Sequence, residues 1–442
     1  MYLGLPPIQT QFEGSLETLQ QGAHKKVSTP RRQKRILAIG SMPPFPPPLT
    51  GAQQRVYNVT AGLAKHYQVV LICPERAEYP TAPSALCSEL GIQEYIGVPF
   101  SSNRGYSRWA GAVTTAAALL PRAVPAHIEE SIPMPLLHTI QELHMKSPFD
   151  AVWAFRSWSA ELAKRAGLRS IIADIDDFES RIWAQEISSL GSYGRKPLHV
   201  HLAKRLAKYE ERLHQRFSAA VVVKEEDRVL MTKEANCRIF CVPNGAAIPD
   251  EGSLIRTSVS APSALFVGTL NYQPNIDSIT WFAGEILPKL LELHPMLKFI
   301  VVGKGRLPAT ASWVNDHPQV VIHESPATLL PYYNSATVAV APIRTGAGTR
   351  IKVLEALAHK CPLVATSEAV AGINLTNGVH FTRADDVQAF VEACSRIVQN
   401  RQLQLDLGEA GYNWVSRFAS WARAGDDAAA AVSAVLAKGN EV

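Results

Sequence analysis

The chain has 442 residues, of which 47% are hydrophobic and 19% are charged, and its formal net charge is +5 at pH 7. A chain of this length can bury two sizeable cores, and its composition excludes both a disordered and a fibrous protein. The charge is too small by itself to indicate a nucleic-acid partner, so we expect none, although it would suit anionic substrates or a membrane surface.

The spacing of the cysteines and the length of the apolar segments indicate the cellular location to expect. Six cysteines without regular spacing do not form a disulfide framework, so we expect a cytoplasmic protein. Cys237 and Cys241 would share one face of a strand, but no second ligand pair is near them, and neither a metal nor a cofactor is expected. No segment has the ~20 consecutive apolar residues that a membrane-spanning helix needs, and the N-terminal segment lacks the apolar core of a signal peptide.

The first 33 residues are polar, lack a sustained period and end in a basic run. This pattern favours a disordered lead-in. The basic run would also suit contact with anionic lipid, so peripheral membrane association stays open as an alternative.

Residues 34–243 read as one domain of alternating strands and helices. Strands are predicted at residues 35–40, 69–73, 151–155, 170–174, 219–223 and 238–242, with a helix that opens at Arg55 and another over residues 202–217. This βαβ order argues for a doubly wound parallel sheet, in which ligands lie at the carboxyl ends of the strands. Residues 101–147 read as helices, for which a plain core role is an equal alternative to a binding role.

Two neighbouring carboxylates, Asp176 and Asp177, follow the strand at residues 170–174. Paired carboxylates beyond a strand end suit a functional site, whereas Asp177 could instead cap the next helix. We expect Asp176 to line the site and Asp177 to cap or brace.

The alternation restarts after residue 243, with strands predicted at residues 264–268, 298–303, 319–323 and 336–341 and a helix from about residue 275. Two similar α/β halves around a hinge follow from this repeat. The last helix, which contains Trp414, Phe418 and Trp421, is expected to cross back to the first half and to pack there.

Residues 337–366 are the most informative stretch. A strand, a loop with Gly346 and Gly348, a helix that begins near Arg350 and a second buried strand follow one another. The helix start would present unpaired N–H groups and the positive end of its dipole to an anion. Lys352 and Glu355 are three residues apart and share one face, so they would match a diphosphate and a ribose in that order. An ordinary solvated pair is the alternative.

This stretch resembles the donor-site signature of glycosyltransferase family 4, nucleotide-sugar-dependent enzymes of the GT-B fold. Residues 355–358 and 362–366 match the second half of the family motif, and residues 346–352 fit a branch with a Gly-x-Gly-Thr-Arg-x-Lys loop. The first Glu of the motif, which contacts the transferred hexose in the family, falls on Ala347. The resemblance therefore implies that the sugar is held by backbone amides of Ala347, Gly348 and Thr349, or by the other domain.

The resemblance also assigns roles outside this stretch. Gly51 stands where the family has a glycine facing the cleft, Asp176 stands at the usual histidine, and residues 101–147 would supply acceptor contacts. Two cations that the family places on the diphosphate are replaced by Thr269 and Pro274, after Gly268, so Lys352 and Arg350 would supply the positive charge. His323 and Glu324 would lie beside the nucleobase, and the loop at residues 303–306 is a second candidate for phosphate contact.

These observations predict an α/β protein of the GT-B fold, with two Rossmann-like parallel-sheet domains facing across a cleft and a C-terminal helix that crosses back. The expected divisions are residues 1–33, an acceptor domain over 34–243, a donor domain over 244–415 and a helix over 416–442. The implied function is metal-independent, retaining transfer of a hexose from a nucleoside diphosphate sugar to a glycan, lipid-linked or small acceptor, with Asp176 and Lys352 as catalytic residues. Alternatives are a non-catalytic scaffold or partner subunit and a sugar-nucleotide epimerase.

Overall fold

The computed structural model describes residues 32–44, 50–75, 83–99, 123–125, 128–129, 132–189, 196–231, 238–256, 261–345 and 350–438. From Lys34 onward the chain forms one compact unit, Lys34–Val442. The predicted lead-in before residue 32 and most of the predicted acceptor region at 101–147 lie outside the described residues.

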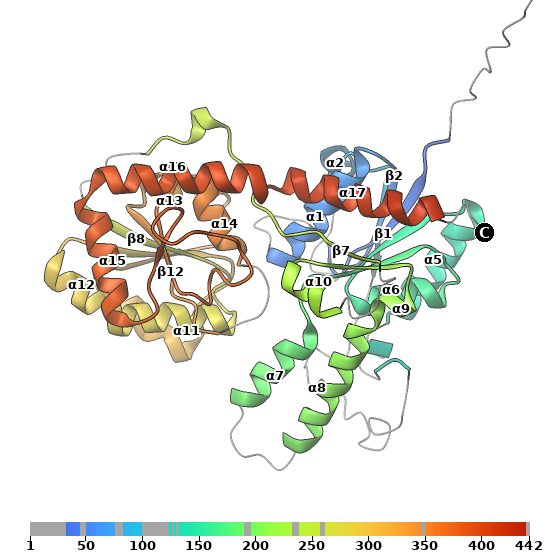
Figure 1. Ribbon diagram of the computed structural model, residues 1–442, viewed down its shortest axis with the longest axis horizontal. Coiled ribbons are helices and arrows are strands. Elements are labelled where there is room, and N and C mark those ends of the chain that lie inside the picture. The colour runs from blue at the N-terminus through green and yellow to red at the C-terminus, as the bar shows by residue number, and fades with distance from the viewer. Residues whose placement is uncertain are drawn as a thin grey trace, which may run out of the picture. The chain divides into compact units, whose positions relative to one another are not determined.

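The first half contains a sheet of seven parallel strands in the order β3-β2-β1-β4-β5-β6-β7 (Figure 1). The strands are β1 Arg35–Ile39, β2 Gln68–Glu75, β3 Glu94–Pro99, β4 Ala151–Phe155, β5 Ile171–Ile175, β6 Ala219–Val222 and β7 Ile239–Cys241. The helices are α1 Gly51–Ala64, α2 Pro83–Leu90, α5 Met134–Lys146, α6 Ser157–Arg165, α7 Glu179–Ser189, α8 Lys196–Glu211, α9 Leu213–Arg216 and α10 Glu225–Met231.

Most positions in the strands of this sheet are apolar because both faces are covered, and the buried Asp174 of β5 is an exception. In β1, Ile36 and Ala38 pack into a core with residues of α1 and α17, whereas Leu37 and Ile39 pack into the core on the opposite face. Successive side chains of a strand point to opposite faces, so one continuous apolar run serves two cores.

The second half contains a sheet of six parallel strands in the order β10-β9-β8-β11-β12-β13. The strands are β8 Ser263–Val267, β9 Lys298–Gly303, β10 Val320–Glu324, β11 Val338–Ala341, β12 Leu363–Ala365 and β13 Thr382–Arg383. The helices are α11 Gln273–Trp281, α12 Leu287–Leu293, α13 Leu330–Ser335, α14 Ile351–Ala358, α15 Val387–Gln399, α16 Arg401–Phe418 and α17 Trp421–Lys438, with a π-helical turn at Phe282–Ile286 and 3-10 turns at Glu251–Ser253 and Ala309–Asp316.

The last helix, α17, returns to the first sheet as predicted (Figure 1), but of the three aromatic residues assigned to it only Trp421 belongs to it. Trp414 and Phe418 end α16, where Trp414 packs against the core of the second half and Phe418 is exposed. A methyl group on Gly62 of α1 would lie 2.2 Å from Gly425 Cα of α17, so only glycines let these helices approach so closely. The Tyr67 hydroxyl beyond α1 donates to the carbonyl of Ala429 at 3.1 Å. Trp421 is buried in the same core.

Several elements differ from the sequence-based expectation. The helix predicted to open at Arg55 begins four residues earlier, at Gly51. The helix predicted over 202–217 is interrupted at Arg212, where α8 has ended and α9 has not begun. The strands β3 and β13 were missed. β3 contains Gly97 and ends at Pro99, two residues that weaken a strand pattern, and β13 has only two residues. Their pairing with a neighbouring strand, rather than their own sequence, makes them strands.

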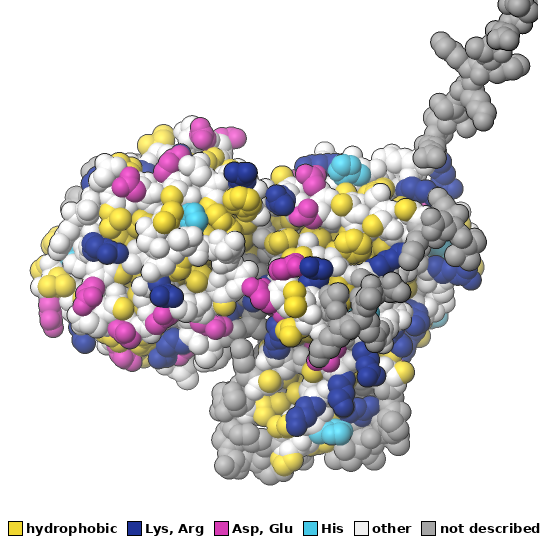
Figure 2. Space-filling view, viewed as in Figure 1, with side chains coloured by type: hydrophobic (Ala, Val, Ile, Leu, Met, Phe, Trp, Pro, Cys, Tyr) yellow, Lys and Arg dark blue, Asp and Glu magenta, His cyan; other side chains and the backbone are white. Residues whose placement is uncertain are grey.

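Charge is unevenly distributed over the surface. Figure 2 shows acidic and basic side chains interspersed over the second half, whereas lysines and arginines gather over α8. In the part of the chain that the structure describes, no helix combines the length and apolarity needed to cross a membrane.

Candidate active site

The predicted anion-binding helix is α14, and it follows the loop as the sequence indicated. Arg350 stands at its N-cap position with φ −82° and ψ 86°, and its guanidinium lies 3.2 Å from the Glu368 carboxylate beyond β12. The Arg350 side chain does not cap the helix start, and no other described residue is seen to do so. The loop residues Gly346, Ala347, Gly348 and Thr349 lie outside the described residues.

Lys352, in the first turn of α14, points toward β8. Its Nζ atom donates to Asn275 Oδ1 at 2.6 Å and lies 4.1 Å from the centre of the Phe266 ring. A methyl group on Gly268 would lie 2.8 Å from this Nζ, so the predicted residues Gly268 and Lys352 do meet. Burial and the nearby Arg350 lower the pKa of Lys352 to about 7, against the opposing effect of Glu355.

Asn275 is a residue of this site that the sequence did not reveal. Its side chain is buried, and its Nδ2 atom donates to the carbonyl of Thr269 at 2.8 Å. This bond leaves Oδ1 to accept from Lys352, so the carboxamide fixes the ammonium over the end of β8. The sequence showed only an asparagine at the start of a predicted helix. Its contact with Lys352 could not be predicted, because the two residues are 77 positions apart.

Glu355 faces the first half of the chain. Gln54 of α1 donates to its Oε1 atom at 3.0 Å, and a methyl group on Gly51 would lie 3.3 Å from the Ile351 side chain. Burial raises the pKa of Glu355, opposed by the Gln54 hydrogen bond and by Lys352. The start of α1, whose first residue is Gly51, therefore meets α14. Two carboxylate oxygens here can accept from paired hydroxyl groups of a ligand.

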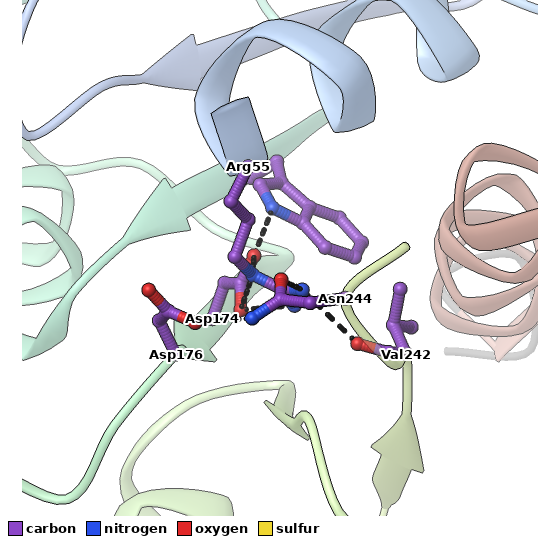
Figure 3. Close-up of polar contacts among 6 residues, drawn as sticks. Arg55, Asp174, Asp176, Val242 and Asn244 are labelled. Atoms are coloured by element: carbon purple, nitrogen blue, oxygen red, sulfur yellow. Dashed lines mark hydrogen bonds and ion pairs between the residues drawn. The ribbon is translucent and has the colours of Figure 1, made fainter. Parts of the chain in front are cut away.

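Asp174 of β5 and Asp176 just beyond that strand belong to a polar network that α1, β4, β5 and the segment after β7 share (Figure 3). Arg55 donates to Asp174 through Nε at 3.0 Å and Nη2 at 2.7 Å, and the Trp153 ring donates to the same carboxylate at 2.9 Å. Arg55 Nη1 donates to Asn244 Oδ1 at 2.8 Å, and Asn244 Nδ2 donates to Asp176 at 2.9 Å.

Asp177 does not cap the next helix, which was one of the two roles expected of it. The Glu210 carboxylate of α8 does so instead, because it accepts from the amides of Glu179 at 2.7 Å and Ser180 at 3.3 Å. Burial and the neighbouring Asp176 raise the pKa of Asp177 to about 6, although cations oppose the rise. These cations are Arg156, Arg350 and Lys224.

Arg350, at the start of α14, is one of the cations that act on Asp177, just beyond β5. The end of β5 therefore lies close to the start of α14. Arg156 directly follows β4 with a φ of 79°, a conformation that is costly for a residue with a side chain. Backbone strain of this kind clusters at functional sites.

His323 and Glu324, which were also predicted as site residues, end β10. This strand is separated by β9 from β8, the strand that Lys352 contacts. The His323 ring is 4.9 Å from the Tyr332 ring, and Glu324 pairs with Arg306 at 2.9 Å. A methyl group on Gly303 would lie 1.7 Å from the Gly268 carbonyl oxygen. A glycine is therefore needed at position 303 to let the ends of β8 and β9 approach each other. This packing requirement explains the glycine without any contact to a phosphate.

Asp174 is held by Arg55, and Asp176 is held by Asn244. Among the described residues, no group of three or more potential metal ligands comes together. Cys237, half of the cysteine pair noted in the sequence, lies outside them.

Comparison with known proteins places this geometry in a family context. Residues 261–400 match the family model described as glycosyl transferases group 1, so a glycosyl transferase domain occupies this part of the chain. An uncharacterized 44.6 kDa protein from the cps region of Klebsiella pneumoniae is 22% identical over 137 residues, which are 29% of this chain and 35% of that protein. The chain thus matches about a third of that relative's length.

Solved structures extend the likeness over nearly the whole chain. Sucrose-phosphate synthase from Thermosynechococcus elongatus is 14% identical, with a TM-score of 0.65 over 92% of this chain and 98% of its own. HepE from Anabaena, solved in complex with UDP-glucose, is 11% identical, with a TM-score of 0.60 over 90% of this chain and 99% of its own. At such identities the likeness shows the fold, and it confirms the GT-B architecture of two Rossmann-like sheets.

Proposed function

We propose that this chain is a retaining glycosyltransferase that moves a hexose from a nucleoside diphosphate sugar to an acceptor. The observation that carries the proposal is α14, whose first two turns hold Lys352 and Glu355 beside a helix start that its N-cap residue Arg350 does not cap, in the region matched by the family model. An ammonium and helix amides suit a diphosphate, and a carboxylate one turn on suits a ribose.

In the proposed reaction, the bond between the anomeric carbon and the diphosphate oxygen breaks while the acceptor oxygen bonds to the same face of that carbon. The departing diphosphate oxygen takes the acceptor proton, and Lys352 stabilises the negative charge that develops there. Preorganised charges of this kind are usually the largest contribution to catalysis. Asp176 is proposed to stabilise the positive charge that develops on the sugar.

A neighbour crystallised with UDP-glucose makes that compound the first donor to test. The purified chain should bind it and hydrolyse it slowly without an acceptor, releasing UDP and glucose. Mass spectrometry and NMR of the products separate the candidates: a free sugar of unchanged configuration supports the proposal, an altered sugar still joined to UDP indicates an epimerase, and a panel of nucleotide sugars without turnover or binding indicates a scaffold.

The proposed reaction needs no metal, because Lys352, Arg350 and the start of α14 are proposed to supply the positive charge at the diphosphate. Turnover should therefore persist in EDTA at the rate measured before chelation. A loss of turnover in EDTA that magnesium or manganese restores would contradict this expectation and would point to oxygen ligands around a metal–diphosphate complex.

Glu355→Gln should raise the dissociation constant for UDP-glucose about tenfold or more, because a hydrogen bond to a charged partner contributes about 1.5–3 kcal/mol. Calorimetric titration measures this change. Glu392→Gln is the matched control, since Glu392 of α15 also accepts from a glutamine, Gln388, at 2.9 Å but is exposed. Equal affinities of the Glu355 variant and the control would remove Glu355 from the donor site.

Affinity for UDP-glucose should depend on pH through Lys352. The charge of this ligand is constant near neutrality because both phosphates are esterified. A bound diphosphate favours the ammonium and so raises the Lys352 pKa above its value of about 7 in the free protein. Binding should therefore be tightest below about pH 7 and weaken by up to about tenfold per unit as the pH rises. Titrations of Lys352→Met should lack this slope, and a slope that survives in that variant would assign it to another group.

A further inference from the structure

Asn244 is a buried residue of the network that the proposed reaction does not use. It follows β7 in the segment that joins the two sheets, and only 3% of its surface is exposed. Its carboxamide bridges two charged side chains, accepting from Arg55 at 2.8 Å and donating to Asp176 at 2.9 Å (Figure 3).

The chemistry of these partners fixes how the carboxamide is oriented. A guanidinium only donates and an ionised carboxylate only accepts, so the bridging side chain needs an acceptor at one end and a donor at the other. Arg55 cannot turn away, since its remaining donors are held by Asp174 and by the carbonyl of Val242 at 3.1 Å. The Nδ2 donor of Asn244 is therefore directed at Asp176.

The backbone beside Asn244 is fixed as well. Ala246 donates to the carbonyl of Ala419 at 2.9 Å and accepts from the amide of Trp421 at 3.1 Å. A methyl group on Gly245 would lie 2.5 Å from the backbone of Ser420 and Trp421. Residues 245–246 and 419–421, in the two segments that connect the sheets, are thus hydrogen-bonded and closely packed. Asn244 directly precedes this contact.

We infer that Asn244 is a positioning residue, whose carboxamide aims the Asp176 carboxylate at the reacting sugar. This inference rests on the proposed function and adds a residue that touches neither substrate. Without the Asn244 donor, Asp176 would have freedom to rotate away from the position in which it stabilises developing charge. Positioning of this kind affects the transition state more than the binding of the donor.

Asn244→Asp is the sharpest test, because it keeps the shape and the acceptor for Arg55 but presents an oxygen to Asp176. Its kcat should fall at least about tenfold, with KM for UDP-glucose within about twofold of the wild type. Asn244→Ser, which is uncharged and too short to bridge both partners, should likewise lower kcat and leave KM nearly unchanged. Asn400→Asp is the control: Asn400 Oδ1 accepts from the Leu403 amide at the start of α16, and aspartate caps equally well.

A double variant distinguishes positioning from a general effect on folding. Asp176→Asn alone should lower kcat, and adding Asn244→Asp to it should cause no further loss, because Asn244 acts only through the Asp176 carboxylate. A further loss in the double variant, or wild-type kcat in both Asn244 variants, would overturn the inference while the proposed function stands. A wild-type chain that neither binds nor turns over any nucleotide sugar would overturn the proposed function itself.

Discussion

Lys352→Ala should reduce turnover of a nucleotide sugar at least about a hundredfold, since removing one preorganised charge from a developing anion costs on the order of 10²–10³ in rate. The Nζ atom is held by Asn275 at 2.6 Å, so its position does not depend on the ligand. Steady-state kinetics with UDP-glucose measure the loss, and calorimetry measures the accompanying loss of affinity.

The same variant should unfold at or above the wild-type temperature. Burial lowers the pKa of Lys352, which means that the folded protein holds its ammonium at a cost in free energy. Loss of activity with retained stability is the mark of a residue that serves function. Lys289→Ala, on the exposed side of α12, is the control and should change neither property. Wild-type turnover in the Lys352 variant would exclude this site.

Arg55→Met should lower the free energy of unfolding by about 3–5 kcal/mol, because it leaves the Asp174 carboxylate buried without its charged partner. Both side chains are almost inaccessible, at 1% and 0% of their surface, and Nη2 lies 2.7 Å from Oδ1. Urea unfolding monitored by circular dichroism measures the loss. Arg344→Met is the matched control: its pair with Asp277 is 44% and 32% exposed, and such pairs contribute about 0–1 kcal/mol.

The deficit of Arg55→Met should depend on pH with a defined sign. Arg55 lowers the pKa of Asp174, and without it burial raises that pKa further above the unfolded value of about 3.9. A group with a raised folded pKa destabilises the protein as the pH rises through that pKa. The deficit should therefore shrink as the pH falls, and Asp174→Asn in the same chain should remove this pH dependence. A deficit that does not change with pH would show that lost packing, not the unpaired charge, causes it.

The sequence determined the elements whose signal is local. Buried parallel strands need unbroken apolar runs, so 151–155 and 298–303 were located to the residue as β4 and β9. The frame of strand, glycine loop and helix around Lys352 was visible for the same reason, since the spacing within a helix fixes which residues share a face. Two repeats of this alternation predicted two α/β halves, and the family resemblance of residues 346–366 implied the GT-B fold, which the solved structures confirm.

Tertiary structure alone decided which side chains meet. Asn275 and Lys352, or Asn244 and Asp176, are separated by 77 and 68 residues, and no local period relates them. The helix cap shows the same limit: Asp177 stood where a cap is usual, yet Glu210 accepts from the amides of α7 because α8 packs beside that helix start. A polar side chain bonds to whichever partner packing brings within reach, so hydrogen bonds between distant residues appear only once the chain is folded.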